Sequence, residues 1–112
     1  MRTIKRKKPR IFCVSKKNNI FLKDVGKIYL NDDENLTITS SNKKNYEICK
    51  KSWGYYATPS LNDRLRKNGF RTFLVKQRKK LFVLLVENNK QKQFNHYIKM
   101  EKYQIIKRLD TY

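Results

Sequence analysis

The residues best suited to binding chemistry are a run of aromatic side chains and the basic residues that follow it. The run is WGYY at residues 53–56, and the next cations after it include Arg64, Arg66, Lys67 and Arg71. Exposed rings can stack on unpaired bases while nearby cations meet phosphates, and Gly54 lacks a side chain that would keep a ligand away. The pattern leaves a second interpretation open, in which Trp53 and one tyrosine close the edge of the core.

We expect seven residues to contact a nucleic acid in this way, two by ring stacking and five by charge. The cations come from the run after the rings and from the basic linker at 77–80. The seven residues are Trp53, Tyr56, Arg64, Lys67, Arg71, Lys79 and Lys80. The chain has no aromatic octamer of the RRM kind and no GxxG loop, so we expect electrostatic recognition that tolerates many base sequences.

The balance of charge favours an anionic partner. The 112 residues include 28 Lys and Arg against 9 Asp and Glu, a net charge of +19. Residues 1–23 carry nine basic side chains and no acid, residues 24–49 have a net charge of −2, and residues 50–112 have a net charge of +12. Such segments are typical of proteins that bind nucleic acid or an acidic surface. Lysine outnumbers arginine 20 to 8, which an AT-rich gene would also produce, so this alternative stays open.

The sequence predicts no catalytic residue, no metal site and no cofactor. The one histidine, His96, has no Gly-x-Ser-x-Gly elbow to accompany it. The acidic run at 32–34 lacks the spacing of a calcium loop, and three glycines cannot form a glycine-rich phosphate loop. Cys13 and Cys49 are far apart and outside any CxxC pair, which favours buried reduced thiols. A small enzyme that uses His96 or a cysteine is the least supported hypothesis.

Hydrophobic periodicity predicts a single α+β domain over residues 11–112, with an antiparallel sheet of about five strands and two helices in the order βββαββα. Polar turns separate the predicted strands, which are 27–31, 36–39, 46–49, 70–76 and 81–86. Helical spacing predicts the second helix over residues 88–101. The short apolar runs at 11–14 and 19–22 could be edge strands, and residues 103–112 could be either a helix or a strand.

The first helix is predicted over residues 59–67. Thr58 followed by Pro59 is typical of a helix start, because threonine can cap the first N–H groups and proline has no N–H to leave unpaired. Asn68 and Gly69 supply a left-handed exit. We therefore expect a short helix held on the sheet by its leucines.

Two other segments have specific expectations. The continuous apolar run at 81–86 predicts a strand that is buried on both faces and central in the sheet. Residues 1–10 carry six positive charges and almost no apolar anchor, which predicts a basic, mobile tail. These residues also lack the apolar run of a secretory signal, and no window reaches 18 apolar residues, so we expect a cytoplasmic protein without a membrane span.

The order of residues 46–112 resembles that of small uncharacterised bacterial proteins encoded among genes for surface polysaccharides and sugar nucleotides. The resemblance rests on the run from Trp53 to Phe70 and on LFVLLVE at 81–87. It implies a bacterial cytoplasmic accessory or interaction protein in surface-polysaccharide biosynthesis, and it assigns no functional residue. The basic residues at 1–10 are not part of it.

The leading hypothesis from the sequence is a non-catalytic binding protein for an anionic partner, with RNA or a ribonucleoprotein favoured over DNA. The alternative, from a different class, is the accessory protein that the resemblance implies. The sequence predicts no oligomeric state.

Overall fold

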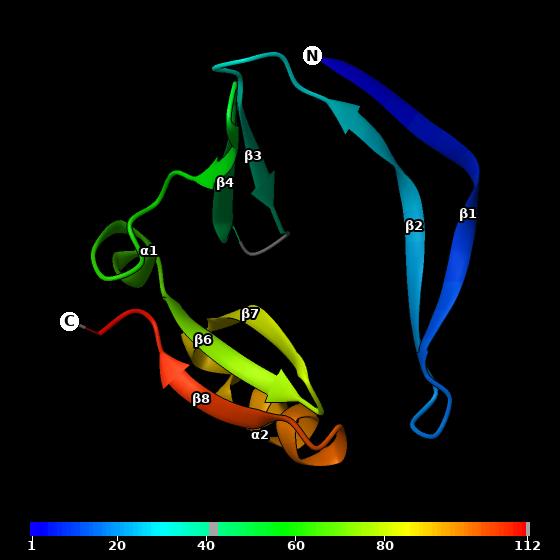
Figure 1. The fold of residues 1–112 in the computed structure, drawn as a ribbon, viewed down its shortest axis with the longest axis vertical. Helices are drawn as coiled ribbons and strands as arrows, with labels where there is room; N and C mark the ends of the chain where they lie inside the picture. The colour runs from blue at the N-terminus through cyan, green and yellow to red at the C-terminus, as the bar shows by residue number, and fades with distance from the viewer. Residues whose placement is uncertain (41–42, 112) are drawn as a thin grey trace. The chain divides into compact units, whose positions relative to one another are not determined.

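The structure, a computed structural model, describes residues 1–40 and 43–111. Contacts divide the chain into two compact units, each assembled from two segments. Unit 1 contains residues 1–35 and 49–56, and unit 2 contains residues 36–48 and 57–112. The described residues form eight antiparallel strands in three small sheets, with two α-helices (Figure 1). The predicted α+β class with antiparallel sheets is confirmed, although the sequence predicted about five strands.

Five strands precede the first helix, two strands separate the helices, and a last strand follows the second helix. The elements are β1 (Arg2–Ser15), β2 (Ile20–Tyr29), β3 (Asn35–Thr39), β4 (Asn45–Lys51), β5 (Gly54–Ala57), α1 (Arg64–Lys67), β6 (Phe70–Gln77), β7 (Lys80–Glu87), the 3₁₀ turn η1 (Asn88–Lys90), α2 (Gln91–Met100) and β8 (Gln104–Arg108). The sheets have the strand orders β1-β2, β3-β4-β5 and β7-β6-β8.

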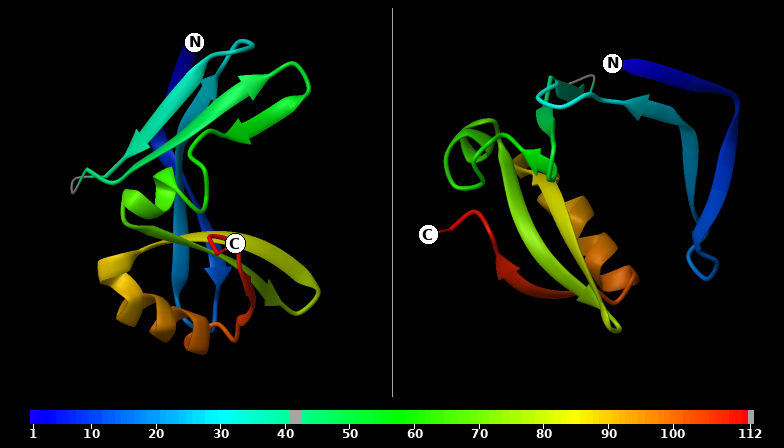
Figure 2. Two further views of the ribbon diagram at one scale, coloured as in Figure 1. Left: turned by 90° about the vertical axis from the view of Figure 1, so that its left-hand side faces the viewer. Right: turned by 45° about the horizontal axis from the view of Figure 1, so that its top comes forward.

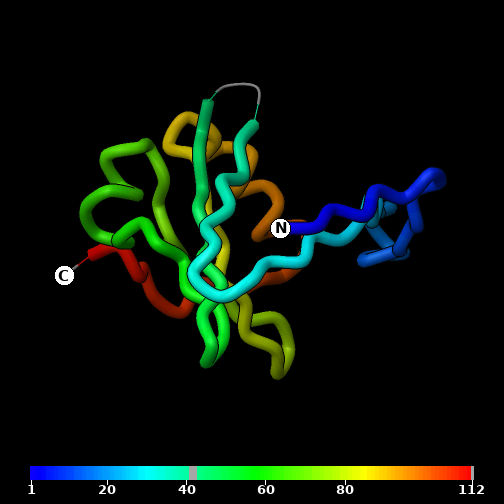
Figure 3. Tube along the Cα trace, turned by 90° about the horizontal axis from the view of Figure 1, so that it is seen from above, coloured from blue at the N-terminus to red at the C-terminus, as the bar shows by residue number. Residues whose placement is uncertain are grey.

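In unit 1 the basic N-terminal segment is a strand, whereas the sequence predicted a mobile tail at 1–10. β1 pairs with β2 along a long antiparallel hairpin, drawn in blue in Figure 3. The backbone ladder and an acidic partner offset the repulsion between like charges, because Asp24 accepts a hydrogen bond of 3.1 Å from Arg10. The register shifts between Lys5 and Arg10, around Pro9, whose nitrogen cannot donate to the ladder.

The sheet β3-β4-β5 contains two of the predicted strands. The predictions at 36–39 and 46–49 are confirmed as β3 and β4. The runs at 19–22 and 27–31 were predicted as separate strands, but most of both belongs to the single strand β2. The polar loop between β3 and β4 includes residues 41–42, which lie outside the described residues.

In unit 2 the predicted hairpin of 70–76 and 81–86 is confirmed as β6 and β7, which pair from Phe70 opposite Glu87 to Gln77 opposite Lys80. The expected position of the second strand is wrong, because β6 is central and β7 is an edge strand. Leu81 on β7 is accordingly 61% exposed. The C-terminal segment forms the third strand, β8, instead of extending the helix.

The core of unit 2 lies between this sheet and α2, which covers one face of it (Figures 1 and 2). Side chains alternate across a strand, so Phe73 and Val75 of β6 share one face. They pack with Val86 of β7 and Phe94 of α2, and the ring centroids of Phe73 and Phe94 are 4.9 Å apart. Phe94 belongs to the helical stripe that the sequence predicted.

Helix α1 is shorter than the predicted helix of 59–67. The hydroxyl of Thr58 donates a hydrogen bond to Glu47, 3.2 Å away, and does not cap the helix. The hydroxyl oxygen of Ser60 instead accepts a 2.9 Å hydrogen bond from the backbone N–H of Arg64, the first residue of α1. The predicted exit is confirmed, since Gly69 has a φ of +90°.

Leu65 should be the residue that holds α1 in place. Its side chain is 0% exposed, so Leu65→Ala is expected to lower the free energy of unfolding by about 2–5 kcal/mol. The same substitution at the exposed Leu81 should change it by about 0.5 kcal/mol or less. Urea unfolding of both variants measures the difference, and equal losses would contradict the burial of Leu65.

Candidate nucleic-acid interface

The aromatic run of unit 1 points outward, which answers the question that the sequence left open. Trp53 is 70% exposed, Tyr55 67% and Tyr56 46%. The rings of Trp53 and Tyr56 form a pair with centroids 6.4 Å apart and planes tilted by 40°. We call these three side chains the aromatic platform. Exposed rings of this kind offer flat apolar faces on which unpaired bases can stack.

Gly54 keeps the space beside the platform open. It begins β5 with a φ of +146°, a conformation that other residues rarely adopt. A side chain built at this position would have no contact within 4 Å among the described residues, apart from the chain neighbours of Gly54. A base or ribose could therefore approach the backbone between Trp53 and Tyr55.

The lysines next to the platform are paired with acids. The ammonium group of Lys50 lies 5.7 Å from the centroid of the Tyr55 ring and 3.2 Å from a carboxylate oxygen of Asp32. Lys51 is 2.7 Å from Asp33, and its hydrogen bond lowers the pKa of that carboxyl group. The positive charges of Lys50 and Lys51 beside the platform are therefore compensated by Asp32 and Asp33.

The other predicted cations lie in unit 2, where some are paired with acidic side chains and others are not. Arg64 donates two hydrogen bonds of 3.2 Å to Glu47, and Lys67 is 2.8 Å from Asp63. Lys79 and Lys80, in contrast, are exposed at the turn between β6 and β7 and have no ion pair with any described residue. The positive charge at this turn is available to a partner, whereas that of Arg64 and Lys67 is largely compensated.

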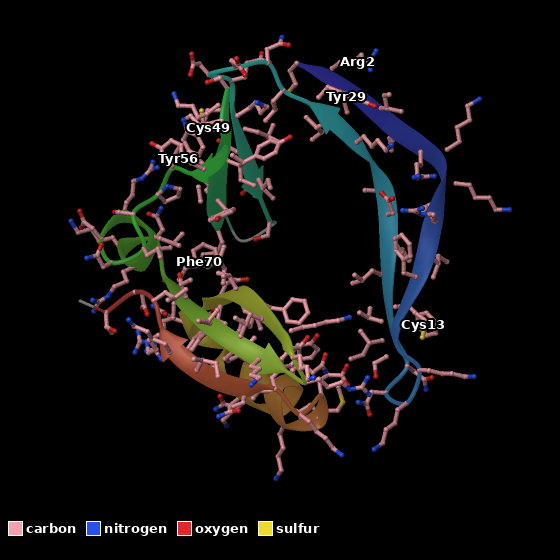
Figure 4. All side chains as sticks on the ribbon, in the orientation of Figure 1. Arg2, Cys13, Tyr29, Cys49, Tyr56 and Phe70 are labelled. Atoms are coloured by element: carbon pink, nitrogen blue, oxygen red, sulfur yellow. The ribbon has the colours of Figure 1, made fainter. Side chains whose placement is uncertain are left out.

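The seventh predicted residue, Arg71, lines a pocket of about 260 Å³ within unit 2. Three arginines from three elements converge there, one from α1, one from β6 and one from the end of β8. We call this site the arginine pocket. Its lining residues are Arg66, Phe70, Arg71, Asn88, Arg108 and Asp110. Figure 4 labels Phe70, which begins β6 at this pocket.

A buried carboxylate fixes the position of one of these arginines. Asp110 is fully buried just beyond β8, and both of its carboxylate oxygens accept hydrogen bonds from Arg108, at 3.0 Å from Nε and 2.6 Å from Nη2. Arg66 donates to the backbone oxygen of Asp110 at 3.4 Å, and Arg71 donates to the side-chain oxygen of Gln91 at 3.3 Å. Each guanidinium group is thus tethered by at least one bond.

Sequence reasoning identified Arg71 but not the pocket around it. Arg108 and Asp110 are separated by one residue, a spacing that places both side chains on one face only where the chain is extended. The sequence did not decide whether this segment is helical or extended, so no pattern indicated that it lies beside β6. Arg66 belongs to the predicted basic run, yet its spacing gave no reason to prefer it over Arg64.

The β1-β2 hairpin adds two pairs of a basic and an aromatic side chain that were not predicted. The guanidinium carbon of Arg2 lies 4.3 Å from the centroid of the Tyr29 ring, and the two residues are labelled in Figure 4. That of Arg10 lies 4.2 Å from the centroid of the Phe12 ring. Such contacts hold each cation over a ring face, and Arg10 is in addition paired with Asp24 at 3.1 Å.

The described residues contain no group of three or more His, Cys, Asp and Glu side chains that could hold a metal ion. His96 is exposed on α2. Both cysteines are free thiols, but only Cys49 is buried as predicted, whereas Cys13 is exposed near the end of the hairpin. No helix in this part of the chain is long and apolar enough to cross a membrane.

Comparison of the chain with known protein families, with curated proteins and with solved structures gave no match. The resemblance to small proteins of surface-polysaccharide gene clusters therefore stays a prediction.

Asp110 should make the free energy of unfolding depend on pH in the acidic range. Hydrogen bonds from Arg108 lower its pKa from the ordinary value of 3.8, so the folded protein keeps the carboxylate charged where the unfolded chain already binds a proton. The stabilisation is complete above that ordinary pKa and is lost as the pH falls below it. Asp110→Asn should therefore cost about 1.5–3 kcal/mol of unfolding free energy at pH 7 and little at pH 2.

Urea unfolding of the parent and variant at the two pH values measures this difference. Asp63→Asn is the matched control, because the Asp63–Lys67 pair is exposed and should contribute little to stability at either pH. A loss at Asp110 that is the same at both pH values would contradict the role of the ion pair.

Proposed function

We propose that this protein is a non-catalytic binding protein for single-stranded RNA. The observation that carries the proposal is the outward orientation of the aromatic platform, with Trp53 and Tyr56 paired and Tyr55 beside them. Because these rings are exposed to solvent, a base can stack on them without breaking packing contacts inside the protein. Stacking accepts every base, which agrees with the sequence-tolerant recognition expected from the chain.

Phosphate contacts fall to the cations that lack a compensating acid. Lys79 and Lys80 are the strongest of the predicted set, and Arg71 contributes from the arginine pocket. Arg64 and Lys67 have a smaller role, because a phosphate must first compete with Glu47 or Asp63. Unit 1 thus offers ring faces for stacking, and unit 2 offers cations for phosphate contacts.

The charge of the chain supports the same partner. Unit 1 carries twelve basic and four acidic side chains, and unit 2 carries sixteen basic and five acidic ones, so both units are strongly positive. An AT-rich gene would enrich lysine, but three of the eight arginines meet in one pocket. Composition alone does not account for that convergence.

Trp53 provides a direct test, because it is the only tryptophan of the chain. Stacking of a base should quench its fluorescence when a single-stranded oligouridine is added. Trp53→Ala and Tyr56→Ala should each weaken binding by about 1–3 kcal/mol, as expected for the loss of one stacked base. Fluorescence anisotropy of a labelled oligonucleotide measures the affinity of every variant.

Trp53→Phe and Tyr56→Phe are the matched controls, because each keeps an aromatic ring and should retain most of the affinity. Binding that survives both alanine substitutions would contradict the platform. A deoxyuridine oligonucleotide of equal length shows whether the ribose matters, and tighter binding to it than to RNA would overturn the choice of RNA.

The salt dependence of binding should identify the cations in use. Each phosphate contact that is lost should make the slope of log K against log salt concentration less negative by about 0.7 for a single strand. The double variant Lys79→Gln, Lys80→Gln should therefore change the slope by about 1.4 in total. Lys67→Gln should change it little, because Lys67 is already paired. Affinity that does not depend on salt would refute phosphate contacts altogether.

A further inference from the structure

The arginine pocket has chemistry that the aromatic platform does not share. It lies entirely within unit 2 and is lined by Arg66, Arg71 and Arg108 together with the carboxylate of Asp110. We propose that this pocket is a discrete binding site for one phosphate-monoester group, held as a dianion. The inference goes beyond RNA binding and does not depend on it.

The described residues that line the pocket do not balance its charge among themselves. Three guanidinium groups face one carboxylate, which leaves an excess of two positive charges around a space of about 260 Å³. The buried ring of Phe70 forms part of the wall and excludes water from that side. Because like charges repel, an anion between these arginines would relieve the repulsion.

Enough hydrogen-bond donors remain to hold such an anion. A guanidinium group has five N–H donors. Within the described residues Arg108 uses donors on two of its nitrogens for Asp110, Arg66 uses one for the backbone of Asp110, and Arg71 uses one for Gln91. These bonds fix the planes of the guanidinium groups and leave most donors unused, so the site is organised before a ligand enters.

The size of the excess charge selects the ligand. A phosphate monoester carries between about −1.5 and −2 charges at pH 7 and has three terminal oxygens. It therefore matches both the two surplus charges and the fork geometry of several arginines, which bind phosphate in pairs of parallel hydrogen bonds. A single carboxylate or an internal phosphodiester carries only one negative charge and would leave the pocket positive.

Asp110 acts here as a positioning residue. Without its carboxylate, Arg108 would have no fixed orientation, and three free guanidinium groups would carry three surplus charges. Asp110 also holds Arg66, which donates a hydrogen bond to the backbone oxygen of Asp110. The carboxylate thus sets both the geometry of the site and the charge that the ligand must supply.

Inorganic phosphate is the probe for this site. The chain has a mass of 13.6 kDa, so amide and arginine Nε resonances can be followed by nuclear magnetic resonance in a phosphate-free buffer. Titration should shift the resonances of the pocket residues in a saturable way. Arg71→Gln and Arg66→Gln should each weaken phosphate binding about tenfold, as expected when a charge-assisted hydrogen bond is lost.

Arg78→Gln is the matched control, because it removes the same charge at the exposed turn between β6 and β7, outside the pocket. It should leave phosphate binding unchanged. The pocket variants keep Arg108 and Asp110, so the buried carboxylate retains its partner and a dispersed spectrum reports that each protein is folded. Phosphate that does not shift the pocket resonances, or binds the Arg71→Gln and Arg66→Gln proteins as tightly as the parent, overturns the proposal.

The protonation state of the ligand gives a second test. With methyl phosphate as the probe, a phosphate monoester whose second pKa is about 6, binding should strengthen between pH 5.5 and pH 7.5 as the dianion forms. The charged groups that line the pocket, three arginines and the ion-paired Asp110, stay ionised over this range. Sulfate, a dianion throughout, should bind with the same affinity at both pH values. Equal binding of phosphate at both pH values would overturn the choice of a dianion.

Two oligonucleotides distinguish the source of the phosphate group. A tetrauridine with a 5′-phosphate and the same oligonucleotide with a 5′-hydroxyl group are compared on the parent protein and on Arg71→Gln. A preference for the phosphorylated end that Arg71→Gln abolishes would assign the site to RNA termini. Phosphate binding without such a preference would assign it to a small phosphorylated molecule. Because the 5′-hydroxyl oligonucleotide carries no phosphate monoester, its binding tests the proposed RNA-binding function, and failure of either proposal is seen separately.

Discussion

Strand β6 has hydrogen-bonded neighbours on both sides, and the rest of unit 2 depends on this position. Because side chains alternate, one face of the strand presents Phe73 and Val75 to α2, and the same face presents Arg71 to the pocket. The apolar contacts and the charged site therefore use one strand and one face. Packing against α2 fixes the strand, and the strand in turn places the arginine. A basic pocket is tolerated there because the neighbouring side chains are held by a hydrophobic core.

Ion pairs divide the cations of this protein into two groups. Exposed pairs such as Arg64–Glu47 and Lys67–Asp63 contribute little to stability, about 0–1 kcal/mol each. They nevertheless decide where positive potential remains, because a paired cation is nearly neutral to a distant anion. The net charge of the chain is thus a poor guide to its binding surface. The positive potential is concentrated at the exposed turn at 78–80 and in the arginine pocket, although these two places hold only a small part of the basic residues.

The sequence predicted what depends on neighbouring residues and missed what depends on distant ones. Period-2 runs identified β3, β4 and the β6-β7 hairpin, since alternation is local. A run of apolar residues does not reveal how many neighbours a strand has, so β7 was placed at the centre instead of the edge. The start of α1 was misjudged because Thr58 bonds to Glu47, eleven residues away. Likewise, the partners of Arg71 in the pocket include Arg108, which only the pairing of β6 with β8 brings near.

Strand β4 has a consequence for how the protein can be made. Its first four residues belong to unit 2 and its last three to unit 1, and each unit is completed by a segment that follows it. A growing chain therefore cannot finish unit 1 until residue 56 has been synthesised, although residues 1–35 emerge first. Neither unit can be excised by a single cut. The two units therefore share one strand, and neither can be completed without residues that also build the other's part of β4.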